Sequence, residues 1–144
     1  EMSGHMFFQE RWYGFDDGLY AGARLLEILS ARADANTVLK ALPDSTSTPE
    51  LNLEMREGEP FELVRRLREA ALASPSCFAD AREVITLDGL RVEFAHGFGL
   101  ARASNTTPMV VLRFEADDAA ALAEIEAAFR RALDAAWPGL ALPF

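Results

Sequence analysis

Apolar residues in the first third of the chain recur at the spacing of a helix. From Leu19 onward they are three to four residues apart, which predicts a helix over 19–32, and a shorter helix is expected over 35–42. Asp16 or Asp17 precedes the first helix and can cap it, because a short carboxylate accepts hydrogen bonds from the unpaired N–H groups of a first turn. This part of the chain is therefore expected to be helical.

The pattern changes after residue 50. Apolar and polar residues alternate over 51–56, and this period of two predicts a half-buried strand that ends before Gly58. A helical spacing then returns over 61–72 and predicts an amphipathic helix. The apolar stripe of that helix is expected to consist of Phe61, Val64, Leu67, Ala71 and Leu72.

The last sixty residues combine strand patterns with one long helix. Val84–Leu87 and Leu90–Phe94 flank Asp88-Gly89, a dipeptide that favours a tight two-residue hairpin because a type I′ turn needs positive φ at both central positions. The further expected elements are strands over 98–103 and 109–115 and a helix over 118–136. The succession predicts an α+β domain with a four-stranded, mainly antiparallel sheet and two helices on one face.

Two prolines and a run of hydroxyl side chains mark the segment 43–49. Proline cannot continue a helix and short polar residues favour turns, so this segment is expected to be a hinge linker. The chain is thereby divided into residues 1–42, the linker 43–49, and residues 50–144.

Composition restricts the function. The 144 residues carry a formal net charge of −9, which argues against a nucleic-acid surface, since such a surface needs a clustered basic face. No apolar run approaches the ~18–20 residues that span a bilayer. The single cysteine, Cys77, cannot form an internal disulfide, and a cytoplasmic location without membrane partners is expected.

The segment between the last two expected strands carries the most distinctive chemistry. It begins with Arg102, whose planar fork of donors matches two phosphate oxygens, and Ser104, Asn105 and Thr106 add neutral donors. The backbone of the turn, including Ala103, can complete an anion-binding nest. The same residue types also form ordinary turns, so phosphate binding and a plain turn both remain open at this point.

Several segments in a fixed order carry a family likeness. The chain opens with Glu1-Met2-Ser3-Gly4-His5 and continues with Arg11-Trp12 and Asp16-Asp17-Gly18. With the Arg-Ala-Ser-Asn-Thr-Thr-Pro loop at 102–108, the chain resembles the α-D-phosphohexomutases, and most of all their bacterial phosphomannomutase/phosphoglucomutase branch. The segments 47–50 and 86–89 extend the likeness over nearly the whole chain.

The resemblance implies an enzyme that interconverts the 1- and 6-phosphates of hexoses such as glucose and mannose. In that family a phosphoserine and Mg²⁺ carry the reaction, and glucose 1,6-bisphosphate is the intermediate and activator. A Ser-His-Asn-Pro phosphoserine segment and an Asp-Gly-Asp-x-Asp magnesium segment do not occur here. Both are therefore expected in missing N-terminal domains, and this chain, which starts at Glu1, is expected to be a C-terminal portion that is inactive alone.

The resemblance also assigns roles. Residues 1–42 correspond to the tail of the third, α/β, domain of the mutases, and residues 50–144 to the fourth domain. The distal phosphate loop corresponds to Arg102, Ala103 through its backbone, Ser104, Asn105 and Thr106. The sugar-recognition loop corresponds to Glu1, Met2, Ser3, Gly4 and His5. His5 is in addition a candidate acid or base, with a structural role as the alternative.

Other reactive residues have ordinary explanations. Asp16 and Asp17 lack companions at ligand spacing, so no metal site is expected in this chain. Cys77 has no histidine partner, His96 is expected at a strand end on the surface, and the helix arginines are expected to pair with nearby carboxylates. The aromatic residues Trp12, Tyr13 and Phe15 are expected in a core, with a sugar-stacking platform as the alternative.

Two other functions stay open. The chain could be a stand-alone, non-catalytic module that binds a phosphorylated ligand or a protein, in which case residues 1–42 should be buried against the rest. A fragment of an enzyme should instead leave the aromatic stretch 7–15 partly exposed. A glucosamine- or acetylglucosamine-phosphate mutase is the third possibility, and the Glu-Met-Ser-Gly-His loop speaks against it.

Overall fold

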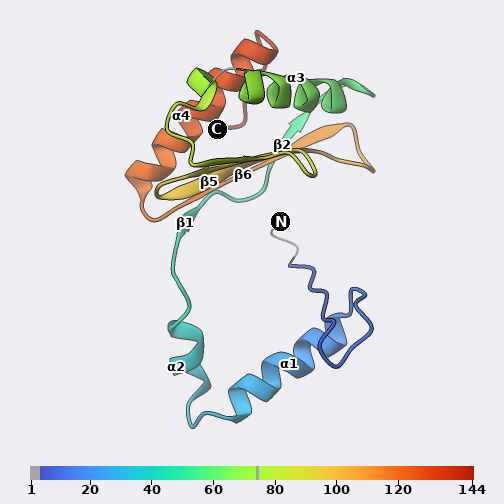
Figure 1. The fold of residues 1–144 in the computed structure, drawn as a ribbon, viewed down its shortest axis with the longest axis vertical. Helices are drawn as coiled ribbons and strands as arrows, with labels where there is room; N and C mark the ends of the chain where they lie inside the picture. Colours follow the sequence, from blue (N-terminus) through green and yellow to red (C-terminus); the bar gives the residue numbers. More distant parts are fainter. Residues whose placement is uncertain (1–3, 74) are drawn as a thin grey trace. The chain divides into compact units, whose positions relative to one another are not determined.

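The computed structural model describes residues 4–73 and 75–144, and the chain divides into two compact units, residues 1–44 and 45–144 (Figure 1). The division falls inside the segment 43–49 for which a hinge is expected. Each unit is described by itself.

The first unit is helical, as expected. Helix α1 spans Gly18–Ser30 and helix α2 spans Ala35–Lys40. Asp17 is the N-cap of α1, where its carboxylate accepts the backbone N–H groups of Leu19 and Tyr20, both at 3.0 Å. Asp34 caps α2 in the same way. Neither helix has a buried residue, although α1 carries an apolar face.

The loop that leads into α1 folds back on itself. A β-bridge joins Phe7 to Asp16, and the Gly14 N–H donates to the Phe8 carbonyl at 3.0 Å. The expectation that all three neighbouring aromatics lie in a core is wrong for two of them, because Tyr13 is 83% and Phe15 52% exposed. The third, Trp12, stacks on Tyr20 of α1, with ring centroids 4.3 Å apart.

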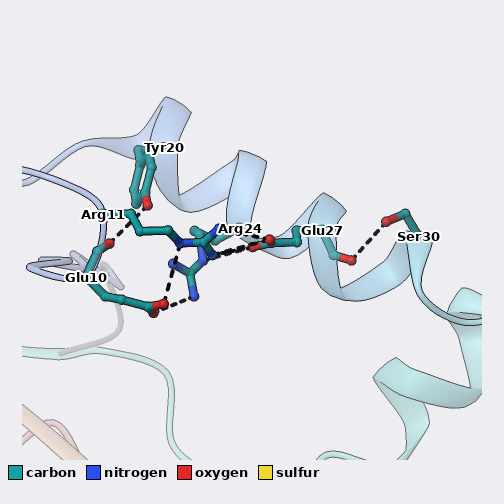
Figure 2. Close-up of polar contacts among 6 residues, drawn as sticks. All are labelled: Glu10, Arg11, Tyr20, Arg24, Glu27 and Ser30. Atoms are coloured by element: carbon teal, nitrogen blue, oxygen red, sulfur yellow. Dashed lines mark hydrogen bonds and ion pairs between the residues drawn. The ribbon is translucent and has the colours of Figure 1, made fainter.

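Ion pairs hold this loop on the helix (Figure 2). Arg11, in the loop, binds the Glu27 carboxylate of α1 at 2.9 Å, and Arg24 of α1 binds Glu10 at 2.9 Å. The Tyr20 hydroxyl donates to the Glu10 carbonyl at 3.1 Å. The hydrogen bond and charge of Arg11 hold the pKa of Glu27 below its ordinary value. Loop and helix are therefore joined by two ion pairs of opposite charge.

The second unit is an antiparallel sheet with helices on one side (Figure 1). The strands are β1 (Thr46–Ser47), β2 (Leu51–Glu54), β3 (Glu83–Ile85), β4 (Leu90–Phe94), β5 (Gly97–Ala103) and β6 (Met109–Ala116). Their order is β1-β6-β5-β4-β3, and β2 also pairs with β6. The helices are α3 (Glu59–Ala73), the short 3₁₀ helix η1 (Pro75–Phe78) and α4 (Ala119–Ala136). The α+β class is confirmed, but the sheet has six strands and not four.

One additional strand lies inside the expected linker. Thr46 pairs with Ala116, and Leu51 pairs with Leu112, so β1 and β2 follow one another along the same edge of β6. Residues 46–47 are therefore part of the sheet and not of a linker. The edge of a strand such as β6 presents N–H and C=O groups with which any extended segment can pair. The proline and hydroxyl pattern of 43–49 gives no sign of this pairing. The hinge itself stays a prediction.

The predicted β3–β4 hairpin is confirmed, but its turn is wider than expected. Strand β3 ends at Ile85 and β4 begins at Leu90, so the four residues 86–89 lie between the two strands. A two-residue turn would pair Leu87 with Leu90, whereas Leu87 is 94% exposed. Gly89 has a φ of +97°, so the glycine is required here, although in a longer loop.

The core lies between the sheet and the two long helices. Along β6, alternate residues from Val110 to Ala116 are buried and face α3 and α4, which lie on the same side of the sheet (Figure 1). The predicted helix over 118–136 is confirmed as α4, in which Ile125, Phe129 and Leu133 are buried. In α3 the stripe differs from the prediction: Phe61 and Leu72 are exposed. The residues that α3 buries are Pro60, Leu63, Val64 and Leu67.

The expected surface pairing of the helix arginines is confirmed on α3. Arg65 binds Glu62 at 2.7 Å, and Arg66 binds the same carboxylate at 2.8 Å. None of the helices that the structure describes is both long enough and apolar enough to cross a membrane.

Candidate functional site

Arg102 stands on the open face of the sheet, one residue before the end of β5. Alternation along the strand buries Ala101 and Ala103 against the helices and directs Arg102 to the opposite face, where it pairs in register with Val111 of β6. Its side chain is 26% exposed. The guanidinium is therefore partly sheltered by the sheet and still accessible from the loop that follows.

That loop, residues 104–108, is organised by one hydroxyl group. Ser104 Oγ accepts the backbone N–H of Thr106 at 3.3 Å and that of Thr107 at 3.2 Å, and it lies 2.8 Å from Thr107 Oγ1. A serine that bonds the backbone two and three residues ahead fixes a turn. Ser104, expected as a ligand donor, thus first of all shapes the loop.

The end of the loop is anchored to the sheet. The Met109 N–H donates to the Thr107 carbonyl at 2.8 Å, and the Pro108 carbonyl accepts the N–H of Met55, just after β2, at 2.9 Å. Asn105 and Thr106 remain exposed at the tip. A rigid base with polar groups at its tip beside an arginine is suited to an anion.

Asp88 is a residue that the sequence analysis treated only as part of a turn. Its carboxylate lies 2.9 Å from Arg102 Nε, although the two residues are fourteen positions apart. The signal in the sequence was the Asp-Gly dipeptide, but only the pairing of β4 with β5 shows that the turn before β4 reaches the end of β5.

Two further arginines share the open face with Arg102. Arg91 of β4 and Arg113 of β6 both pair in register with Leu100 of β5, two residues before Arg102. Each has a carboxylate beside it: Arg91 binds Glu93 at 2.6 Å, and Arg113 binds Glu115 at 3.4 Å. Positive charge is thus concentrated on this face and balanced locally, in a chain whose net charge is −9.

The second group of expected site residues lies in the first unit. Glu1, Met2 and Ser3 lie outside the described residues. Gly4 has a φ of +64°, as a tight turn requires, and His5 is exposed with its Nδ1 in contact with the Asp16 carboxylate. The Phe7–Asp16 bridge brings this pair together, and the contact of Asp16 with His5 was not predicted from the sequence. That His5 and Arg102 serve one substrate stays a prediction.

The remaining candidates are explained structurally. His96 is exposed between β4 and β5 and binds Asp117 at 3.0 Å, as expected of a surface residue. Burial raises the pKa of the Cys77 thiol, which disfavours a nucleophilic thiolate. Over residues 4–73 and 75–144, no group of three or more His, Cys, Asp or Glu side chains could hold a metal ion. These residues therefore do not fit the magnesium that the resemblance implies.

Comparison with known proteins identifies the family. Residues 50–132 match the family model described as the C-terminal domain of phosphoglucomutase/phosphomannomutase, and residues 1–46 match that of alpha/beta/alpha domain III. The first model alone covers more than half of the chain. The chain belongs to the phosphoglucomutase/phosphomannomutase family.

Individual relatives cover nearly all of the chain. It is 57% identical to a phosphoglucomutase of Neisseria gonorrhoeae over 96% of its length, and 48% identical to a phosphomannomutase/phosphoglucomutase of Pseudomonas aeruginosa over 100%. A crystal structure of a phosphoglucomutase/phosphomannomutase family protein from Burkholderia thailandensis superposes with a TM-score of 0.84 at 59% identity, covering 99% of this chain and 29% of that one. The chain spans about 30% of the length of the curated relatives it matches.

Proposed function

We propose that this chain is the C-terminal part of a phosphohexomutase that interconverts hexose 1-phosphates and hexose 6-phosphates, with glucose and mannose phosphates as substrates. The observation that carries the proposal is the position of Arg102 beside the Ser104-organised turn, in a chain of this family. A mutase must hold its sugar phosphate in two opposite orientations. One phosphate therefore needs a fixed clamp while the other end of the sugar reacts.

In this proposal Arg102 supplies the charge of the clamp and the tip of the loop supplies neutral donors. A guanidinium can bind two phosphate oxygens at once, which fixes direction as well as distance. Asn105 and Thr106 are exposed and can reach the same phosphate, and Ala103 contributes its backbone. Ser104 holds the turn in place.

The first unit contributes recognition of the sugar. Glu1, Met2, Ser3 and Gly4 form the loop that binds ring hydroxyls. His5 exchanges a proton near the reacting phosphate, and the Asp16 carboxylate orients its imidazole.

The chemical step depends on groups outside this chain. The phosphoserine, the Mg²⁺ site and the binding of glucose 1,6-bisphosphate belong to the N-terminal domains of the complete enzyme, which acts in the cytoplasm. Magnesium supplies electrostatic stabilisation of the transferring phosphoryl group when bound. The residues of this chain bind and orient the sugar phosphate.

The alternative of a stand-alone module receives less support. Such a module should bury its aromatic side chains, but Phe7 is 65%, Tyr13 83% and Phe15 52% exposed. Exposed aromatic residues at this density favour a fragment whose partner surface is elsewhere.

The test uses the complete enzyme that carries this chain, assayed with glucose 1-phosphate and Mg²⁺. Arg102→Ala is expected to lower kcat/KM by roughly ten- to a hundredfold, because charge-assisted hydrogen bonds to phosphate are lost. Arg131→Ala, which removes an exposed arginine of α4, is the matched control and should leave kcat/KM unchanged. Unchanged kinetics for Arg102→Ala, or mutase activity in the 144-residue chain alone, would contradict the proposal.

A further inference from the structure

We propose that Asp88 is a positioning residue for the phosphate clamp, and that it holds the Arg102 guanidinium in its binding orientation from a turn on the neighbouring strand. The inference rests on the proposed function of Arg102. Its direct support is the 2.9 Å contact between the Asp88 carboxylate and Arg102 Nε. The contact is an ion pair at Nε, the base of the guanidinium fork, so the attraction of the carboxylate favours one orientation of the group.

The backbone of the turn also lies close to Arg102, at Gly89. Leu90 pairs with Ala101, so the preceding residue, Gly89, lies beside Arg102. A Cβ at Gly89 would lie 2.5 Å from the Ala101 carbonyl oxygen and 3.0 Å from the Arg102 Cα. Gly89 also has a φ of +97°, which other residues rarely adopt. The glycine thus permits the close approach that brings the carboxylate of its neighbour to the guanidinium.

The exposure of the two side chains supports an effect of Asp88 on the orientation of Arg102. The Asp88 side chain is 69% exposed, whereas that of Arg102 is 26% exposed. An ion pair this open contributes little to folding stability. Its effect is therefore expected in the orientation of Arg102, whose long side chain would otherwise lose rotamer freedom when phosphate binds.

Charge and orientation act in opposite directions here, and this makes the inference testable. The negative charge of Asp88 lowers the positive potential at the loop and by itself weakens the binding of an anion. Orientation of the guanidinium strengthens binding by reducing the ordering cost. If Asp88 acted through charge alone, its neutralisation would tighten phosphate binding; if it positions Arg102, neutralisation weakens binding.

The experiment compares Asp88→Asn with Asp80→Asn in the complete enzyme that carries this chain. Both variants remove one exposed carboxylate from a loop of the second unit, and Asp80 lines a pocket with Phe94, at the end of β4 away from Asp88. Asp88→Asn is expected to raise the KM for glucose 1-phosphate about two- to fivefold with kcat nearly unchanged, because the clamp binds ground state and transition state alike. Asp80→Asn should leave both constants unchanged, and Asp88→Glu should recover part of the loss.

A second readout follows Arg102 without substrate. In the ¹⁵N spectrum of the complete enzyme, the Arg102 Nε–H signal should shift in Asp88→Asn and not in Asp80→Asn, because only Asp88 lies beside that nitrogen, while the backbone amides elsewhere keep their positions. Preserved amide positions show that the variant is folded. A KM that is unchanged or lowered, or an Nε–H signal that does not respond, would overturn the inference.

The kinetics of the variants distinguish a failure of the proposed function from a failure of this inference. If Arg102→Ala leaves kcat/KM unchanged, Arg102 does not bind substrate and both proposals fail. If Arg102→Ala lowers kcat/KM but Asp88→Asn tightens binding, the clamp stands and only the positioning role is wrong. In an Arg102→Lys background the effect of Asp88→Asn should shrink, because a lysine has no Nε–H fork to orient.

Discussion

The ring of Phe129 packs directly against Gly99, at the contact between α4 and the sheet. A Cβ on Gly99 would lie 2.2 Å from Phe129 Cε2, closer than any real side chain could come. Phe129 is fully buried and also lies edge-on to Phe114 of β6, with ring centroids 5.2 Å apart. The absence of a side chain at one position of β5 therefore determines how closely the helix lies on the sheet that carries Arg102.

Gly99→Ala is expected to lower the free energy of unfolding by about 1–3 kcal/mol, because the added methyl forces Phe129 out of place. Urea unfolding of the chain measures this. Gly22→Ala is the matched control: Gly22 lies within α1, a Cβ there would have no neighbour within 4 Å, and alanine should stabilise by about 0.5–1 kcal/mol. Equal effects of the two substitutions would contradict this account of Gly99.

Thr48, between β1 and β2, continues the hydrogen bonding to β6. Its N–H donates to the Phe114 carbonyl at 3.0 Å, and its hydroxyl accepts the Phe114 N–H at 3.1 Å. Thr48→Val keeps the shape and removes the acceptor, so it is expected to cost about 1–2 kcal/mol and to speed hydrogen exchange at the Phe114 amide. Thr46→Val, at an exposed position of β1, is the control and should leave that amide protected. An unchanged exchange rate at Phe114 in Thr48→Val would show that the hydroxyl is not the acceptor.

Ser104→Ala removes the hydroxyl that organises the phosphate loop. In the complete enzyme we expect the KM for glucose 1-phosphate to rise roughly three- to tenfold, because two backbone N–H groups lose the acceptor that fixes the turn. Steady-state kinetics measure this. Ser30→Ala also removes an exposed hydroxyl bonded to local backbone, in α1, and should have no effect. A KM that stays at the wild-type value would mean that the loop keeps its shape without Ser104.

Glu62 on α3 predicts a pH dependence of stability. Hydrogen bonds from Arg65 and then Arg66 lower its pKa from 4.5 to about 2. Because the pKa is lowered in the folded state, the stabilisation is fully present above pH 4.5 and is lost as the pH falls toward about 2. The pair is exposed to solvent, so the effect should be small and should weaken further at high salt.

Urea unfolding between pH 2 and 6 measures this dependence. Glu62→Gln should flatten the curve over this window, whereas Glu57→Gln, at an exposed position just before α3, should keep its slope. A wild-type slope in Glu62→Gln would assign the acid sensitivity to other carboxylates.

Local patterns predicted most elements of the second unit, but not the pairing at its edges. Periodicity identified β2, β4, β5, β6 and both long helices, because one face of each is buried and the spacing of apolar residues records it. Strand β1 was not predicted because its two residues, Thr46 and Ser47, are both polar and show no alternation of apolar and polar positions. The buried stripe of α3 was misplaced since Phe61 and Leu72 are apolar yet exposed.

The candidate site also has features that the sequence predicts and features that it does not. Arg102 and its polar loop could be recognised from residue types, since a guanidinium followed by hydroxyl and amide groups is a set of donors in consecutive positions. The role of Ser104 within the loop and the contact of Asp88 with Arg102 could not, because hydrogen-bond partners depend on a turn geometry and a strand register that no single segment contains.

The sequence by itself determined the family, the α+β class, an aspartate cap for the first helix and the loop that carries Arg102, because each of these is encoded in neighbouring residues. Only the tertiary structure decided that 46–47 joins the sheet, that Gly99 admits Phe129, and that Asp88 reaches Arg102. The physical reason is that an antiparallel sheet brings together residues distant in the chain. Their contacts depend on register and close packing, which are properties of the assembled fold.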